Sequence, residues 1–327
     1  MTDRSANLKI TVSTLTRKRP EMLAALVRSW GDLVIPSNCI VRFLVVENDK
    51  VANSKQIVQE AGSSLANGCA IEYVLEPELG IPFGRNRAAR EAIANGSDLL
   101  CFVDDDEVVA QDWLERLVAG YRSSSAVLLG APLRAAGPSG RETGVQRLML
   151  RNISNRYLAK EQAAARRGAL NDTGGVTVVT NNWLGETRLF SEVGLWFDET
   201  MRMTGGTDAK FYADAVGQGL TVGWVPDAFV YETIPPERLS FWYQAARGRD
   251  QSNTYMRRKL KNKPVSAVLG FLSIPIRFLG LVVAMILMPI QPDRRFIQIA
   301  RTLGWLVGVI GIFFGYKSAL YKKVSGH

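Results

Sequence analysis

Four consecutive acidic residues, 104–107, directly follow the apolar run 99–103. An apolar run of this length is typical of a buried strand in a parallel sheet, and such sheets bind ligands at the carboxyl ends of their strands. Crowding and burial disfavour ionised carboxylates, and a divalent cation relieves that cost. Carboxylate oxygens suit Mg²⁺ or Mn²⁺, which commonly also hold substrate phosphates. The alternative is a solvated acidic turn that begins the next helix.

Polar residues follow two other predicted strands in the same way. Residues 14–17 follow the strand predicted at 9–15, and residues 47–49 follow the strand predicted at 40–46. Because parallel strands end at the same edge of a sheet, we expect these residues to lie near the acidic run. Arg85 and Asn86 begin a predicted helix that can approach this edge. Arginine, polar side chains and a metal-binding triplet together suit a nucleoside diphosphate.

Strands alternate with helices along the first part of the chain. This order predicts an α/β fold with a doubly wound, mainly parallel sheet. We expect strands at 9–15, 40–46, 71–75, 99–103, 176–180, 221–225 and 229–231. We expect helices from 20 and at 54–59, 85–95, 112–121, 151–167, 189–193 and 208–217, with a loop at 80–84.

The chain has 327 residues and a net charge of +9, and its basic residues are concentrated. Residues 237–263 hold eight Lys and Arg against two acids. Beside an apolar tail, this block favours anionic lipid headgroups or a pyrophosphate over nucleic acid as a partner. The single histidine is the last residue, His327, and the three cysteines lack metal-site spacing. This argues against histidine catalysis and His-ligated zinc.

The C-terminal tail contains two apolar stretches, at 265–290 and 302–316. A membrane-spanning helix needs about 20 apolar residues. The first stretch is long enough but contains Arg277, and the second is short. Two shallow helices or a tight hairpin fit as well as two spans, and a soluble helical pair is the alternative. Positive residues at both ends place both ends in the cytoplasm.

Seven segments, taken in order and spacing, resemble glycosyltransferase family 2, the inverting enzymes with the GT-A fold. They are TLTRKRP (14–20), VVENDK (45–50), GIPFGRNRAAREA (80–92), FVDDDE (102–107), DWL (112–114), GLWFDE (194–199) and GGTD (205–208). The likeness is strongest to bacterial exopolysaccharide glucosyltransferases of the succinoglycan type. It implies a Rossmann-like, mainly parallel sheet with helices on both faces, and the apolar tail adds a hydrophobic C-terminal helical membrane segment.

The resemblance and the composition of the C-terminal part together predict domain boundaries. Residues 1–236 match a GT-A domain, with a nucleotide-binding half at 1–130 and an acceptor-binding half at 131–236. Residues 237–264 then form a basic amphipathic linker, and residues 265–327 form a membrane-associated helical hairpin.

The resemblance implies a role for each matching residue. Asp104 and Asp106 match the DXD motif that holds Mn²⁺ or Mg²⁺, and Asp105 lies near the ribose or the sugar. Asp208 matches the catalytic base, and its alternative role is to begin a helix. The other nucleotide-side residues are Thr14 and Thr16 beside the base, Glu47 and Asn48 on uridine, and Arg85 with Asn86.

Three further residues are candidates for binding the acceptor or a diphosphate. Trp183 offers a platform for an acceptor sugar, or else fills the core. Residues 244–247 resemble the QxxRW signature of processive synthases, but Gly248 replaces the tryptophan, which argues against processivity. Arg247 and Arg249 suit a diphosphate, or else they face lipid headgroups.

The implied activity is inverting transfer of a hexose, glucose first, from a UDP-sugar to a lipid-linked saccharide. The enzyme would act at the cytoplasmic face of the bacterial inner membrane, in exopolysaccharide or cell-envelope polysaccharide synthesis, without a nucleic-acid partner. The alternatives are a metal-dependent nucleotidyltransferase, which would need a glycine-rich loop after the first strand, a membrane scaffold that has lost catalysis, and a processive synthase.

Overall fold

The chain, described by a computed structural model, divides into two compact units. The first contains Met1–Arg134, Ala159–Glu232 and Val324–His327, and the second contains Ala135–Leu158 and Thr233–Lys323. The structure describes residue 4 and residues 7–62, 65, 68–138, 140–169, 178, 180–202, 206–262 and 264–318.

The first unit is built on a seven-stranded sheet with the order β3-β2-β1-β4-β8-β6-β9. The four strands from β3 to β4 are parallel, and β8 is antiparallel to both β4 and β6. The strands are β1 (Leu8–Thr16), β2 (Cys39–Glu47), β3 (Ala70–Leu75), β4 (Leu99–Val103), β6 (Leu128–Gly130), β8 (Asn182–Glu186) and β9 (Val222–Trp224). A small second sheet has the order β5-β10-β7, from Glu107–Val109, Val230–Thr233 and Leu133–Ala136.

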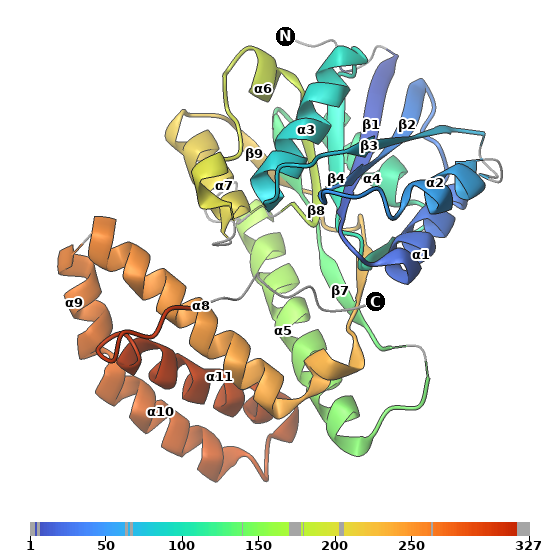
Figure 1. Cartoon of the computed structure of the whole chain (residues 1–327). Coiled ribbons are helices and arrows are strands. Elements are labelled where there is room, and N and C mark those ends of the chain that lie inside the picture. The colour runs from blue at the N-terminus through green and yellow to red at the C-terminus, as the bar shows by residue number, and fades with distance from the viewer. Residues whose placement is uncertain are drawn as a thin grey trace. The chain divides into compact units, whose positions relative to one another are not determined.

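Helices cover both faces of the large sheet (Figure 1), because its central strands are apolar on both sides. Phe43 and Val45 pack in one core with residues of α1 and α4, while Leu44 and Val46 pack in the other with residues of α3 and α7. The helices of this unit are α1 (Pro20–Gly31), α2 (Lys55–Gly62), α3 (Ile81–Ala94), α4 (Trp113–Ser123), α6 (Arg188–Ser191), α7 (Thr207–Gly217) and the 3-10 helix Glu199–Met201. The predicted α/β fold is confirmed.

Two local predictions differ from the structure. The loop predicted at 80–84 is wrong, because α3 already begins at Ile81 and includes Pro82 in its first turn, where proline is tolerated. The strand predicted at 176–180 falls largely outside the described residues, and the strand that pairs with β4 is β8.

The second unit is helical. It contains the first part of α5 (Gly144–Ala169), the 3-10 helix Pro236–Leu239, α8 (Phe241–Asn262), α9 (Pro264–Leu272), α10 (Ile274–Leu287) and α11 (Pro292–Ile310). The segment expected to be a linker is therefore mostly the helix α8, and it packs closely on α11. A Cβ atom on Gly248 would lie 2.7 Å from the carbonyl oxygen of Arg301, and one on Gly304 or Gly308 would also collide with the backbone of α8.

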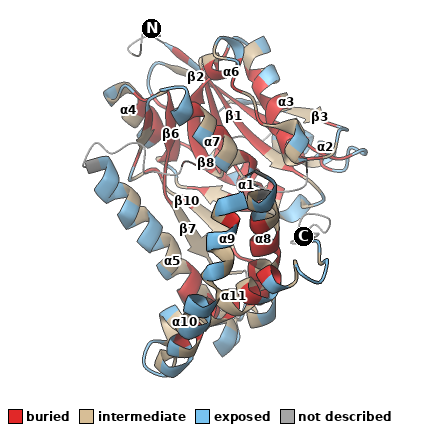
Figure 2. Cartoon of the chain, turned by 90° about the vertical axis from the view of Figure 1, so that its left-hand side faces the viewer, coloured by how far each residue is buried: buried red, intermediate tan, exposed pale blue. Residues whose placement is uncertain are grey.

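Much of α9 and α10 is exposed (Figure 2), and large apolar side chains such as Val265, Leu272 and Ile276 are among the exposed residues. Together they form a stretch, Pro264–Leu287, that is long and apolar enough to cross a membrane, and it is the one such stretch among the described residues. Its most apolar window has a mean hydropathy of 2.1 and is 11% buried. The second apolar run belongs to α11, whose inward residues Ile297, Ala300 and Val309 are buried.

Candidate active site

The acidic run lies at the carboxyl edge of the parallel strands, as predicted. Asp105 is held by two groups that follow β1: Thr16 donates from Oγ1 to its Oδ2 at 2.9 Å, and Arg19 donates to its Oδ1 at 2.7 Å. Arg19 also donates to Asp106 at 3.3 Å. The ends of β1 and β4 therefore meet through charged hydrogen bonds.

Arg85 brings two distant carboxylates together. Its guanidinium lies 3.8 Å from Asp104 and 3.7 Å from Asp208, and it donates to the hydroxyl of Thr207 at 3.2 Å. Arg85 comes from the first turns of α3, and Asp208 lies in the first turn of α7. A helix N-terminus favours a negatively charged side chain, so the first turn of α7 is a suitable position for the Asp208 side chain.

The acidic run carries more negative charge than its neighbours neutralise. Partial loss of hydration is the largest cause that raises the pKa of Asp104, to about 7. The carboxylates of Asp106 and Asp105 add to the rise, and Arg85 opposes it. Burial likewise raises the pKa of Glu107, whose carboxylate accepts a hydrogen bond from the Asp104 amide at 2.7 Å. The site therefore favours binding of positive charge.

Glu47 and Asn48 make their hydrogen bonds within the unit. The carboxylate of Glu47 accepts bonds from the Ser54 amide at 2.9 Å and from the Tyr73 hydroxyl at 2.6 Å. The Asn48 amide donates to the carbonyl of Glu78 at 2.7 Å and accepts from the Gly80 amide at 2.8 Å. Both residues thus fix the loops that follow β2 and β3. Their contacts with a nucleotide stay predictions.

Asn86 and Thr14 are also buried at this edge of the unit. Asn86 donates to the carbonyl of Phe197 at 2.9 Å and accepts from the amide of the same residue at 3.0 Å, so it holds the segment before α7 against α3. Thr14 is fully buried inside β1. Nucleotide contacts of these two residues also stay predictions.

Trp183 is 1% exposed and lies in the core. Its ring stacks on Phe211, with centroids 6.0 Å apart, and meets Phe102 edge-on at 5.2 Å. Its indole therefore fills the core, which is the alternative that the sequence allowed. The neighbouring Asn182 accepts a hydrogen bond from the Trp113 indole at 2.9 Å and so fixes the start of β8.

Arg247 and Arg249 belong to α8, in the second unit. Arg249 donates to the Asp250 carboxylate at 2.8 Å and lies 5.0 Å from the ring centre of Tyr316. Arg247 lies close enough to Arg156 and Arg301 to lower the pKa of both. The role of either arginine toward a diphosphate stays a prediction.

Sequence reasoning missed Arg19 and Thr207 as residues of the site. Arg19 lies just after β1, in a segment already expected at the sheet edge beside the acidic run. A positive residue at that place could have been predicted to pair with the aspartates, as it does with Asp105 and Asp106. Thr207 had no signal of its own, because its contact with Arg85 depends on how α7 packs.

The acidic run fits a divalent cation in chemistry. No group of three or more metal-ligating side chains converges in the described part of the chain. Asp105 and Asp106 face Arg19, whereas the carboxylate of Asp104 is 44% exposed. This arrangement suits Mg²⁺ or Mn²⁺, which proteins often bind through one or two carboxylates, with substrate phosphates and water completing the shell.

The chain is similar to a known enzyme family and to a bacterial polysaccharide biosynthesis protein. The model of the family "Glycosyl transferase family 2" matches residues 11–184. The succinoglycan biosynthesis protein ExoM of Rhizobium meliloti is 28% identical over 251 residues, which cover 76% of this chain and 75% of ExoM.

Two solved structures share the fold at low sequence identity. The mannosyltransferase PcManGT of Pyrobaculum calidifontis, in complex with GDP-Man and Mn²⁺, has a TM-score of 0.62 and 13% identity, and the match covers 96% of this chain and 90% of that one. Residues 1–349 of S. aureus TarS, in complex with UDP, have a TM-score of 0.50 and 15% identity, with 98% and 95% covered. The chain spans 45% of the longer TarS structure.

Proposed function

Because the chain belongs to glycosyl transferase family 2 and is a glycosyltransferase, we propose that it transfers a hexose from a nucleotide sugar to a lipid-linked saccharide. The proposed donor is UDP-glucose, and the anomeric centre is inverted. The similarity to a succinoglycan biosynthesis protein supports a place in exopolysaccharide or cell-envelope polysaccharide synthesis.

The observation that carries this proposal is the contact of Arg85 with both Asp104 and Asp208. It places the acidic run that would face the donor beside the carboxylate that would act as the base. A direct displacement needs both groups within reach of one anomeric carbon.

In the proposed reaction, the hydroxyl of the acceptor attacks the anomeric carbon as Asp208 accepts its proton. The bond from that carbon to the diphosphate breaks, and the nucleoside diphosphate leaves with the bonding electrons. Asp104 and Asp106 would hold Mn²⁺ or Mg²⁺, which supplies positive charge to the diphosphate when it is bound. Arg19 and Thr16 keep Asp105 in place at the donor side.

The proposed acceptor and location depend on the second unit. Its stretch Pro264–Leu287 is apolar and exposed, and the unit has 19 Lys and Arg against four Asp and Glu. Apolar surface beside clustered positive charge is typical of proteins held at an anionic membrane. A lipid-linked saccharide at the cytoplasmic face of the bacterial inner membrane is the acceptor that suits this location.

The test measures release of nucleoside diphosphate by the full chain with Mn²⁺ or Mg²⁺ and lipid-linked saccharides extracted from bacterial membranes. UDP-glucose is the first donor and GDP-mannose the second, because the two solved neighbours contain UDP and GDP-Man. We expect acceptor-dependent release that falls at least about 100-fold in Asp208→Asn, since general-base catalysis contributes that much, and that also falls in Asp106→Asn.

The matched control is Asp214→Asn, an acid on the same helix as Asp208 that pairs with Lys210 at 2.6 Å. It should retain release within about twofold, because exposed ion pairs contribute little. Release that persists in Asp208→Asn would assign the base to another residue. A folded chain that releases nothing from either donor would refute the proposed donor class.

A further inference from the structure

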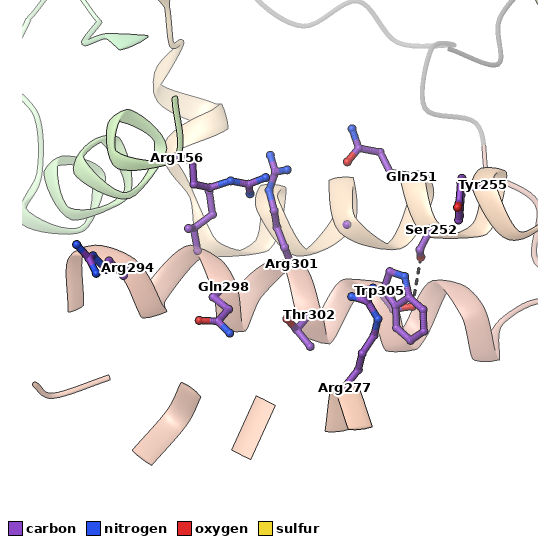
Figure 3. Close-up of a pocket in the computed structure, with 12 residues that line it drawn as sticks. Arg156, Gln251, Ser252, Tyr255, Arg277, Arg294, Gln298, Arg301, Thr302 and Trp305 are labelled. Carbon is purple, nitrogen blue, oxygen red and sulfur yellow. Dashed lines mark hydrogen bonds between the residues drawn. The ribbon is translucent and has the colours of Figure 1, made fainter. Parts of the chain in front are cut away.

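The second unit contains a cavity of about 510 Å³ that the proposed reaction does not use. Four arginines line it, contributed by three helices (Figure 3). They are Arg156 of α5, Arg277 of α10, and Arg294 and Arg301 of α11. Gln251, Ser252 and Tyr255 of α8 line it from another side. We call this cavity the arginine pocket, and its volume lies in the range of ligand sites.

The positive charge of the arginine pocket has no acidic counterpart among its lining residues, all of which the structure describes. Burial first, and then the charges of Arg156 and Arg247, lower the pKa of Arg301 to about 9. The nearest acids along the lining helices are engaged elsewhere: Asp250 with Arg249 at 2.8 Å, and Asp293 with Arg151 at 3.0 Å. Crowded like charges of this kind are costly unless an anion joins them.

The arginine pocket borders the exposed apolar surface of α10 through Arg277. Arg277 lies within the apolar stretch Pro264–Leu287, and its guanidinium stacks 4.2 Å from the ring centre of Trp305. Its neighbours Ile276 and Phe278 are 73% and 59% exposed. A charge in an apolar helix is costly unless it has a partner or a function, and this one lines the pocket. A ligand here can therefore place an anion among the arginines and an apolar chain along α10.

We propose that the arginine pocket binds a diphosphate ester carried on an apolar chain. Guanidinium groups pair with phosphate oxygens through two parallel hydrogen bonds, and four of them suit the charge of a diphosphate better than that of a single phosphodiester. The proposal rests on the proposed function in one respect: if the acceptor is a lipid-linked saccharide, this pocket holds the diphosphate of its carrier. The same chemistry occurs in phospholipid headgroups, so the test separates the two sources.

The test is isothermal titration calorimetry of the full chain in a neutral detergent. The probes are farnesyl diphosphate, inorganic pyrophosphate and farnesol. We expect farnesyl diphosphate to bind at least about tenfold more tightly than either of the other two, because it alone supplies both parts of the ligand. In Arg156→Gln and in Arg277→Gln, its affinity should fall at least about tenfold, since each change removes charged hydrogen bonds.

Both variants should remain folded, because each removes a charge that lacks an acidic partner among the described residues of the pocket. We expect their Tm without ligand to equal or exceed that of the unmodified chain. The matched control is Arg147→Gln on α5, an exposed arginine of the same helix as Arg156 that does not line the pocket. Its affinity for farnesyl diphosphate should stay within about twofold, because its charge lies outside the pocket.

Competition distinguishes the sources of the ligand. Phosphatidylglycerol in the same micelles should leave the affinity for farnesyl diphosphate unchanged if the pocket serves a diphosphate carrier, and should displace it if the pocket serves a phospholipid headgroup. Pyrophosphate that binds as tightly as farnesyl diphosphate, or an affinity unaltered in both pocket variants, would overturn the proposal. The calorimetry measures binding and not sugar transfer. Asp208→Asn should therefore bind farnesyl diphosphate as tightly as the unmodified chain. The result can be interpreted even if the proposed transferase function fails its own test.

Discussion

At the scale of single residues, Arg85 determines whether the candidate site is assembled. Its side chain is buried, and it contacts a carboxylate from the end of β4, another from α7, and the ring of Phe197 at 5.5 Å. At 3.7 and 3.8 Å, the two ion pairs are too long to be hydrogen bonds. The guanidinium therefore attracts both carboxylates without a hydrogen bond to either, and their oxygens stay able to bind other partners.

Replacing Arg85 by glutamine should reduce catalysis more than stability. Loss of the shared cation leaves Asp104 and Asp208 to repel each other, and a displacement of about 1 Å at a reacting group costs on the order of 100-fold in rate. We expect kcat/KM for sugar transfer to fall by about that factor in Arg85→Gln. Arg87→Gln, a partly exposed arginine of the same helix that pairs with Glu91 at 2.7 Å, should stay within about twofold. Equal rates for the two variants would contradict the role given to Arg85.

A cation at the acidic run should stabilise the fold together with a nucleotide. At a concentration about 100 times its Kd, a ligand adds about 2.7 kcal/mol to the free energy of unfolding. We expect Mn²⁺ with UDP to raise Tm by about 3 °C or more, and a chelator to reverse the rise. The rise should disappear in Asp106→Asn and persist in Asp227→Asn, an exposed acid that pairs with Arg116. A rise that persists undiminished in Asp106→Asn would exclude Asp106 as a metal ligand.

At the scale of elements, the packing of α8 on α11 explains why a signature of processive synthases is incomplete. Gly248 stands where that signature has tryptophan, and its Cα faces the backbone of Arg301. Glycine at this point lets the two helices approach closely, and any larger residue would force them apart. Helix packing in this unit thus requires glycine at position 248 and excludes the tryptophan of the signature.

Filling that contact should destabilise the second unit. In Gly248→Ala, overpacking should lower the free energy of unfolding by about 1–3 kcal/mol, and Gly248→Trp should lower it further. The control is Gly280→Ala in α10, where a Cβ meets nothing within 4 Å. That change should be neutral or should stabilise by up to about 1 kcal/mol, because alanine favours helix. Thermal unfolding of the full chain in detergent checks both. A Tm for Gly248→Trp equal to that of the unmodified chain would contradict the packing argument.

The elements that the sequence predicts well are those whose signals are local. The run at β4 ends in three aspartates, so the strand, its sheet edge and the acidic run follow from adjacent residues. The contact between Arg85 and Asp208 does not follow, because it depends on how α3 and α7 pack across the sheet. Trp183 shows the same limit. Its position in β8 does not reveal whether the side chain points into the core or toward a ligand, and its stacking on Phe211 shows that it points into the core.

The ends of elements are less predictable for the same reason. A Gly-Ile-Pro-Phe-Gly segment has the composition of a loop, yet it forms the first turn of α3, because proline lacks only a hydrogen bond that a first turn does not make. The tail is similar. Its hydropathy predicts apolar helices, but the division into α9, α10 and α11 and the inward face of α11 depend on packing with α8.

At the scale of the whole molecule, charge is divided unevenly between the two units. The whole chain has a net charge of +9, whereas the second unit has 19 basic and four acidic residues. The first unit is therefore net acidic, with 21 basic and 27 acidic residues. Such a division favours an anionic surface as the partner of the second unit alone.

Binding to vesicles should follow this division. We expect the full chain to bind vesicles that contain phosphatidylglycerol more tightly than vesicles of phosphatidylcholine, and high salt to remove the difference. Ile276→Glu in α10 should weaken binding about tenfold, because it replaces an exposed apolar side chain that would lie in lipid. Val51→Glu, an equally polar change at a 62% exposed residue of the first unit, should have no effect. Flotation assays measure both, and equal loss in the two variants would refute a specific lipid-facing surface.

The second unit cannot be removed by truncating the chain at its C-terminal end. The second unit takes Ala135–Leu158 from the middle of the chain, where Met149 and Ile153 pack with Leu239 and Ile297. A stop codon after residue 236 removes Leu239 and Ile297. The apolar side chains of Met149 and Ile153 on α5 then lose these packing partners. Deleting the hydrophobic end to gain solubility should therefore produce inclusion bodies. For the same reason, the helical tail could not be exchanged by a simple terminal fusion, because Ala135–Leu158 would have to be exchanged with it.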